Sequence, residues 1–164
     1  MDFEYKYNKY KILYLQLGGK IKKKSHKNSR KKLNEITSNN TLQNMNIMND
    51  NISPNYTEHV SEPWFTLILL GLKTIEGRKN KGRFKDMKIG EIIKWHNEDR
   101  FFFTKIIRKT EYNTFKEMLE TEGINKCLPG FKDIDSGLNV YYKYNTKEEE
   151  NEFKVLAIEL KILK

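Results

Sequence analysis

Aromatic and apolar side chains recur at helical intervals near the start of the chain. Steps of three or four residues separate four of them: Tyr7, Tyr10, Tyr14 and Leu17. Such spacing places side chains on one face of a helix, and Gly18-Gly19 then interrupts it. The pattern predicts a short amphipathic helix within residues 1–19. A helix of this length is marginal by itself in water, so we expect it to need a partner surface.

Residues 20–55 lose this hydrophobic period. They open with a basic cluster and continue as an Asn-, Ser-, Thr- and Met-rich stretch; the cluster consists of Lys20, Lys22, Lys23, Lys24, Lys27, Arg30, Lys31 and Lys32. Too few apolar side chains are present to offset the entropy lost on ordering. We therefore predict a mostly disordered basic tail up to a domain boundary near Ser53-Pro54. The cluster also fits a loose nuclear-localisation or nucleic-acid pattern.

Residues 56–164 alternate short helical and extended patterns. The first elements are predicted in this order: a helix over 64–70 ended by Gly71, an extended segment over 74–78, a polar loop over 83–87, and a hairpin of strands over 92–95 and 101–107. Trp64, Ile68 and Leu69 share one helical face. Asn97-Glu98-Asp99 supplies the turn of the hairpin.

The residue pattern in the C-terminal part of the chain predicts helices followed by a strand. Thr114 caps a helix that Gly123 ends. Further elements follow: a turn over 128–130, a helix capped by Asp135 or Ser136 that contains Leu138, Tyr141 and Tyr142, a solvated acidic turn or helix end over 148–152, and a strand over 153–163 whose apolar residues alternate. Short strands with helices between them indicate an α+β domain, a small β-barrel decorated with helices. An open α+β sheet is the alternative.

The positive charge lies in two separate blocks. The formal net charge of the chain is +9. Residues 1–55 hold 11 Lys and Arg against 4 Asp and Glu, and residues 73–109 hold 12 against 5. A basic block attracts polyanions, most often nucleic acid, although a solvated lysine surface is the plainer interpretation of the tail.

Other features of the sequence exclude several classes of protein. No apolar run is long enough to span a membrane, and the start lacks the features of a signal peptide, so we expect an intracellular protein that is neither secreted nor transmembrane. A single cysteine, Cys127, excludes an internal disulfide, and we favour a buried packing role over a nucleophilic one. His26, His59 and His96 are scattered. We predict no metal and no cofactor.

The stretch Gly71–Arg78 joins an apolar element, a glycine and a set of charged residues. If residues 74–78 are extended, Glu76 and Arg78 share a face and Lys73 lies at the start of the strand. These three side chains either form structural ion pairs or line a cleft in which Lys and Arg bind a phosphate and Glu accepts from a base. Further ligand-binding candidates are Thr74, Lys79, Lys81 and Arg83. Trp95 or a tyrosine from 141–144 could stack on a base, with core packing favoured for Trp95.

Several motifs in the second part of the chain resemble the ASCH domain of the PUA-like superfamily. They are Trp64-Phe65…Ile68…Gly71-x-Lys73-Thr74-x-Glu76-x-Arg78, Gly90-Glu91-x-Ile93, Tyr112-x-Thr114-Phe115-x-Glu117-Met118-Leu119…Glu122-Gly123…Leu128-Pro129-Gly130, Tyr141-x-x-Tyr144 with Glu148 to Glu150, and Val155-Leu156-Ala157-Ile158. The family usually has Asp at the position of Glu91. The resemblance covers about residues 57–163 and implies a β-barrel with helices, a cleft beside Gly71–Arg78, and RNA or other nucleic-acid binding. The N-terminal segment resembles a Lys/Tyr/Leu segment ending in Gly-Gly in proteins of giant DNA viruses.

The resemblance also implies an enzymatic alternative. A bacterial branch of ASCH proteins hydrolyses the acetyl amide of N4-acetylcytidine with a Lys, a Thr and a Glu. Lys73 matches the Lys, Glu122 falls near the Glu, and Glu76 occupies the position of the Thr nucleophile. Thr74 lies two residues away, so the covalent route lacks an obvious nucleophile. Ribonuclease activity, reported for other ASCH proteins, is a further possibility.

We therefore favour binding over catalysis. The predicted partner is RNA or a modified nucleoside, bound by a monomer through the cleft around Lys73, Glu76 and Arg78. The N-terminal helix is a candidate for binding a protein partner, and in a third hypothesis it is the functional element while the domain is a passive scaffold.

Overall fold

The computed structural model describes residues 52–163. Within them Ser53–Leu163 forms one compact unit. The predicted N-terminal helix, the basic cluster and most of the predicted linker lie outside the described residues. Where the chain enters the compact unit, Asn55 bonds to the main chain of Ile92 through both its N–H and its side-chain oxygen, at 2.9 and 2.8 Å.

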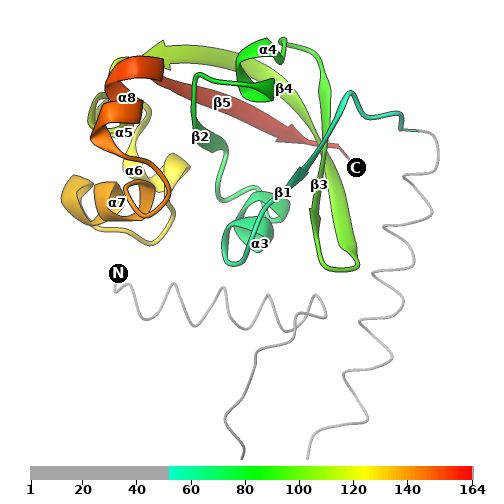
Figure 1. The fold of residues 1–164 in the computed structure, drawn as a ribbon. Coiled ribbons are helices and arrows are strands. Elements are labelled where there is room, and N and C mark those ends of the chain that lie inside the picture. Colours follow the sequence, from blue (N-terminus) through cyan, green and yellow to red (C-terminus); the bar gives the residue numbers. More distant parts are fainter. Residues whose placement is uncertain (1–51, 164) are drawn as a thin grey trace, which may run out of the picture. The chain divides into compact units, whose positions relative to one another are not determined.

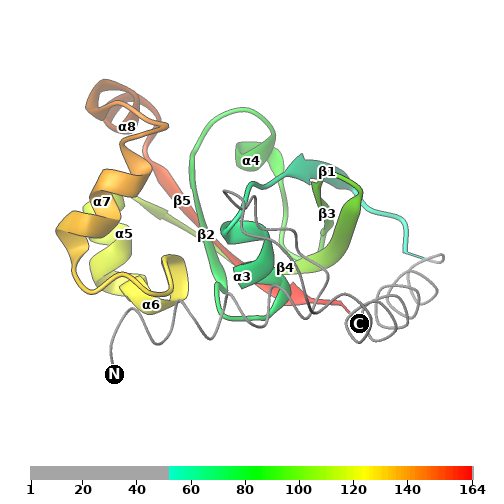
Figure 2. The ribbon, with the colours of Figure 1, turned by 90° about the horizontal axis from the view of Figure 1, so that it is seen from below.

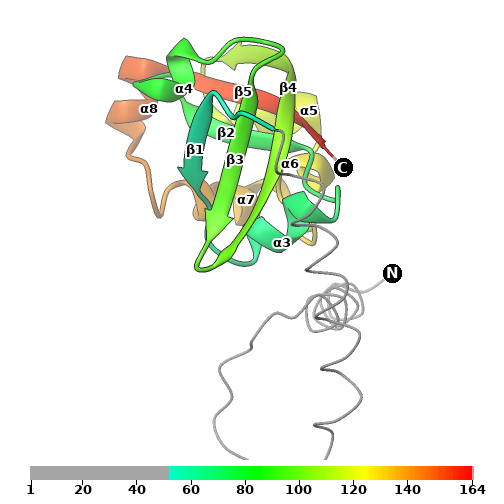
Figure 3. The same ribbon diagram turned by 90° about the vertical axis from the view of Figure 1, so that its right-hand side faces the viewer.

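A curled, five-stranded sheet forms the centre of the unit (Figures 1 and 3). In spatial order its strands are β1 (Tyr56–His59), β3 (Ile92–Asn97), β4 (Arg100–Tyr112), β5 (Val155–Ile162) and β2 (Ile75–Lys79). Only the β1–β3 pair is parallel; the other three pairs are antiparallel. The sheet is a half-barrel with β1 and β2 as its two edge strands, and the predicted α+β class is confirmed.

Six helices lie among the described residues. They are α3 (Trp64–Leu69), α4 (Arg83–Asp86), α5 (Phe115–Glu122), α6 (Ile124–Cys127), α7 (Ile134–Tyr141) and α8 (Lys147–Phe153). Figure 2 shows α5, α6 and α7 gathered on one side of β2 and β5, with α4, β1 and β3 on the other. No helix in this described part of the chain is long and apolar enough to cross a membrane.

The alternation in β5 divides the interior into two hydrophobic cores. Leu156, Ile158 and Leu160 face a core inside the curled sheet, together with Trp95. Val155 and Ala157 face a second core that they share with α5, α6 and α7. The predicted alternation of the last strand is therefore confirmed, because each of its faces meets a different apolar partner.

Local signals located several elements correctly. The helix after Pro63 and the hairpin of β3 and β4 form as predicted, and the Thr114 side chain caps α5 by accepting from the Glu117 N–H at 3.1 Å. Trp95 is fully buried, and its Nε1 donates to Thr104 Oγ1 at 2.8 Å. Cys127 is buried, as expected of a packing residue, and burial raises the pKa of its thiol to about 11.

Several predictions were wrong. Residues 83–86, predicted as part of a polar loop, form a one-turn helix, and so do residues 124–127, for which no element was predicted; both are too short to show a hydrophobic period. Asp133, rather than Asp135 or Ser136, caps α7 by accepting from the Ser136 N–H at 2.8 Å. The acidic run is not a solvated turn, because α8 buries Glu150 at 3% exposure.

Candidate functional site

A cleft of about 680 Å³ lies between the two edge strands of the half-barrel. The end of β1, the strand β2 and the end of α7 all contribute to its walls. The residues that line it are His59, Val60, Ser61, Trp64, Lys73, Glu76, Gly77, Arg78, Lys79, Lys81, Phe84, Leu128, Val140, Tyr141, Tyr144 and Asn145. Five of the seven residues predicted to bind ligand thus line one cleft.

Lys73 lines the cleft with a buried side chain whose ammonium is bonded within the protein. Its side chain is only 3% exposed, and its ammonium has three acceptors. The Nζ atom lies 2.7 Å from the Ile75 carbonyl, 2.6 Å from the Cys127 carbonyl and 3.0 Å from Glu76 Oε2. An ammonium has three protons to donate, so Lys73 is fully engaged by the protein and ties α6 to the start of β2.

Glu76 carries the negative charge between Lys73 and Arg78. Its other oxygen, Oε1, forms an ion pair with Arg78 Nε at 2.7 Å. Burial by itself raises the pKa of the Glu76 carboxyl, but the positive charges of Lys73 and Arg78 outweigh burial and hold this pKa below its ordinary value. Glu76 is therefore ionised at neutral pH, and the three side chains together carry one net positive charge.

Arg78 presents the accessible part of this ion-pair set. Its guanidinium carbon lies 4.8 Å from the ring centre of Phe84, and a third of the side chain is exposed. Neither of its two terminal nitrogens donates a hydrogen bond to another described residue. Glu76 and Phe84 thus fix the guanidinium while leaving the two Nη groups for a ligand.

The remaining predicted binding residues lie at the rim or outside. Lys79 lines the cleft and pairs with Glu149 at 2.7 Å, and Lys81 lines it with its Nζ atom 4.1 Å from the ring centre of Phe153. Thr74 and Arg83 do not line the cleft. The main chain of Thr74 bonds to Lys126 and Leu160, and Arg83 pairs with Glu58 at 3.2 Å.

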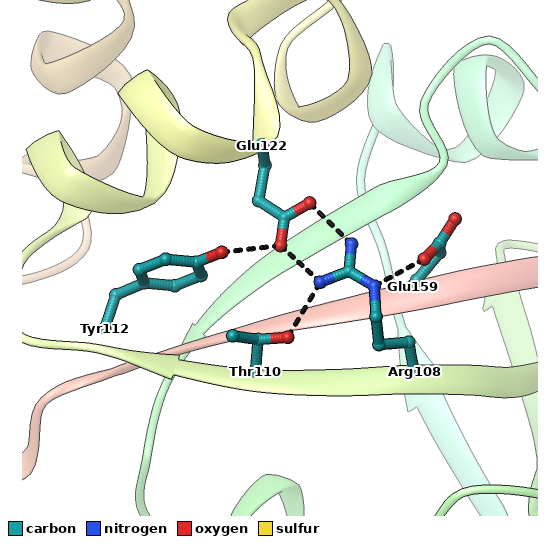
Figure 4. Close-up of polar contacts among 5 residues, drawn as sticks. All are labelled: Arg108, Thr110, Tyr112, Glu122 and Glu159. Carbon is teal, nitrogen blue, oxygen red and sulfur yellow. Dashed lines mark hydrogen bonds and ion pairs between the residues drawn. The ribbon is translucent and has the colours of Figure 1, made fainter.

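Glu122 belongs to a different cluster, shown in Figure 4. Arg108 donates to both oxygens of Glu122, at 2.6 and 2.5 Å, and to Glu159 at 2.7 Å. The Tyr112 hydroxyl also donates to Glu122, at 2.8 Å. The hydrogen bonds from Arg108, and secondly that from Tyr112, hold the pKa of Glu122 below its ordinary value although burial opposes them.

The register of the sheet separates Glu122 from Glu76. Glu159, which also binds Arg108, lies opposite Ile75 of β2 in the ladder. The next residue of β2, Glu76, lies opposite Ile158, which packs in the core inside the curled sheet. Residues directly opposite each other in a ladder point to the same face, and neighbours in a strand point to opposite faces. Glu122 and Glu76 thus lie on opposite faces of the sheet, and the structure does not bring Glu122 into the cleft.

Aromatic side chains complete the walls of the cleft. Tyr144 is 71% exposed, and Tyr141 stacks on Phe115 with their ring centres 4.4 Å apart. The Tyr141 hydroxyl is buried with no hydrogen-bond partner among residues 52–163, and burial raises its pKa well above the ordinary value. The sequence pointed to these tyrosines, but it offered no signal for His59 or Trp64, which the parallel β1–β3 pairing and α3 bring to the cleft.

A model of the ASCH domain matches residues 59–164, which is most of the chain and all of the cleft. The chain belongs to the ASCH family. Two solved structures of similar proteins share this fold. Within the described part of this ASCH protein, no group of three His, Cys, Asp or Glu residues is placed to hold a metal ion.

One of these structures is the crystal structure of hypothetical protein PH0355, at 35% identity and a TM-score of 0.62, covering 66% of this chain and 98% of that one. The other is the solution NMR structure of protein PF0455 from Pyrococcus furiosus, at 33% identity and a TM-score of 0.59, covering 66% of this chain and 97% of that one. No curated protein matches the chain.

Proposed function

We propose that this ASCH protein binds single-stranded nucleic acid, RNA in the first place, in the cleft between β1 and β2. The main observation behind the proposal concerns the contacts of Arg78. Its guanidinium is held by Glu76 and Phe84, while its two Nη groups have no hydrogen-bond partner among the described residues. A planar guanidinium with two parallel donors fits the oxygens of a phosphate.

The charge and shape of the cleft support the same ligand. Four basic side chains and one acidic side chain line it, so it attracts an anion. Tyr144 offers an exposed ring on which an unpaired base can stack. A duplex hides its base faces in the stack, and we therefore expect single strands to bind more tightly than duplexes.

These features support binding better than amide hydrolysis. Glu76, at the position of the nucleophile in the enzymatic branch, is an ionised carboxylate held by two cations. Lys73 donates to three protein acceptors and has no N–H left to donate to a substrate. Glu122 pairs with Arg108 outside the cleft.

The proposal is tested by comparing Arg78→Ala with wild-type protein in binding single-stranded RNA across a range of salt concentrations. We expect the wild type to bind at low salt, and Arg78→Ala to weaken binding about tenfold and to lower the salt slope by about one ion. Arg83→Ala is the matched control, since Arg83 lies outside the cleft and pairs with Glu58. Absent binding at low salt, or equal losses in both variants, would refute the proposed function.

A further inference from the structure

The main chain of β2 is directed alternately towards β5 and towards the cleft. Leu160 N–H donates to the Thr74 carbonyl at 2.9 Å, and Asn80 N–H donates to the Lys154 carbonyl at 3.1 Å. In an antiparallel pair every second residue bonds to the partner strand, so the even-numbered positions from Thr74 to Asn80 face β5. The N–H and C=O groups of Ile75, Gly77 and Lys79 therefore point away from β5, along the open edge of the sheet.

Two of the three outward carbonyls already have donors within the protein. The Ile75 carbonyl accepts from Lys73 Nζ at 2.7 Å, and the Lys79 carbonyl accepts from Lys81 N–H at 2.8 Å. Gly77 has no corresponding bond among the described residues, and it lines the cleft. At the open edge of β2, the C=O and the N–H of Gly77 thus both face the cleft, and the C=O has no donor among the described residues.

The position of Gly77 excludes a side chain. A Cβ atom there would lie 2.7 Å from both Met118 Cε and the Tyr141 hydroxyl oxygen, which is closer than real contacts of this kind. The helices α5 and α7 thus pack directly against the Gly77 backbone on one face of β2. On the other face lie Glu76 and Arg78, so the Gly77 main chain is at the middle of the cleft wall.

We infer that the cleft holds one unpaired nucleobase, edge-on, with the donor and acceptor of its Watson–Crick edge bonded to the C=O and N–H of Gly77. This inference rests on the proposed function and names the part of the nucleic acid that is read. Every standard base carries a donor beside an acceptor on that edge, and a base can offer them only when it is unpaired. An exposed ring, Tyr144, and the two Nη groups of Arg78 are available in the same cleft for the base face and a neighbouring phosphate.

A nucleobase fits this edge better than an added peptide strand. Strand addition uses a row of alternate main-chain groups along the edge, whereas the carbonyls on either side of Gly77 are occupied. One donor–acceptor pair matches a single base. The excess of basic over acidic side chains in the cleft favours a ligand that carries phosphate.

The test uses the full chain, labelled with ¹⁵N, and single-stranded RNA homohexamers of A, C and U. For the hexamer that binds most tightly, a second hexamer carries methyl groups in place of every hydrogen on the donor nitrogen of each Watson–Crick edge, which means two methyl groups on the amino nitrogen of A or C and one on N3 of U. A control hexamer carries its methyl groups on a base carbon away from that edge. We expect edge methylation to weaken binding about tenfold or more, because the Gly77 carbonyl loses its donor, while the control binds as the unmodified RNA does. The Gly77 amide resonance should move with the unmodified hexamer and not with the edge-methylated one.

The outcomes separate the inference from the function on which it rests. If the unmodified and edge-methylated hexamers bind equally tightly and the Gly77 resonance does not move, the protein binds nucleic acid but does not read a base at β2, and the inference is overturned. If no hexamer binds at low salt, the proposed function fails and the inference fails with it.

Discussion

At the scale of single residues, two buried tyrosines differ in what their hydroxyl groups contact. The Tyr112 hydroxyl donates to Glu122 at 2.8 Å, whereas the Tyr141 hydroxyl has no partner among the described residues. Both rings pack in the same hydrophobic core, beside α5 and α7. A buried polar group without a partner costs free energy, whereas a hydrogen bond to a charged group stabilises the fold.

Replacing each tyrosine by phenylalanine should therefore have different effects. Tyr112→Phe should lower the free energy of unfolding by about 2 kcal/mol, because Glu122 loses a donor. Tyr141→Phe should leave it unchanged or raise it by up to about 1 kcal/mol, because the ring contacts persist and no hydrogen bond is lost. Urea unfolding of the two variants and the wild type measures the difference. Equal destabilisation by both would show that the Tyr141 hydroxyl has a stabilising contact within the protein.

At the scale of elements, α8 shows how an acidic segment becomes part of the interior. Its start is a capping box, in which the Thr146 side chain and the Glu149 N–H bond at 3.2 Å and the Glu149 side chain and the Thr146 N–H bond at 3.1 Å. One turn later, Glu150 accepts from the Phe115 N–H at 2.5 Å and from the Tyr142 hydroxyl at 2.9 Å. One buried carboxylate thus joins α8 to the start of α5 and the end of α7.

Removing this carboxylate should separate the role of Glu150 from that of its acidic neighbours. Glu150→Ala should lower the free energy of unfolding by about 2 kcal/mol or more, because the Phe115 N–H at the start of α5 is left buried without an acceptor. Glu152→Ala, on the exposed face of the same helix, should leave stability unchanged. Thermal and urea unfolding of the two variants give the comparison. Similar stabilities would contradict the role of Glu150 in joining α8 to α5 and α7.

At the scale of the whole molecule, two ionised carboxylates lie on opposite faces of the sheet. Glu76 is held by Lys73 and Arg78, and Glu122 by Arg108 and Tyr112, so the pKa of each lies below its ordinary value. A carboxyl whose pKa is lower in the folded than in the unfolded state stabilises the fold above the unfolded value. That contribution is lost as the pH falls through the folded pKa.

The free energy of unfolding should thus change little as the pH falls from 7 to about 5, and then fall below about pH 4.3, the usual glutamate pKa in an unfolded chain. Glu122→Gln should cost about 2 kcal/mol at pH 7 through the weakened bonds to Arg108. Its stability should depend less on pH in the acidic range, so that the gap from the wild type narrows there. A gap that stays constant down to pH 2 would show that the Glu122 charge does not contribute to stability.

Much of the fold could be predicted because its signals are local. Thr114 and Gly123 mark the ends of α5 within one short segment, and the alternation from Val155 to Ile162 specifies a strand with two buried faces. The single turns α4 and α6 were missed because one turn is too short to repeat a period. The cap of α7 at Asp133 lies two or three residues before the predicted positions, Asp135 or Ser136, because Asp, Ser and a second Asp all suit a cap in that segment.

The sequence by itself determined the α+β class, the family, and the grouping of Lys73, Glu76 and Arg78, because residues so close along one chain remain neighbours in any extended or turn conformation. Only the tertiary structure decided what surrounds them. The pairing of β1 with β3 and the packing of α7 against β2 join segments far apart in sequence, and these contacts form the cleft. The same packing put Glu122 on the other face of the sheet and left the Gly77 main chain at an open edge. Those outcomes depend on strand register and edge position, for which a single sequence carries no local pattern.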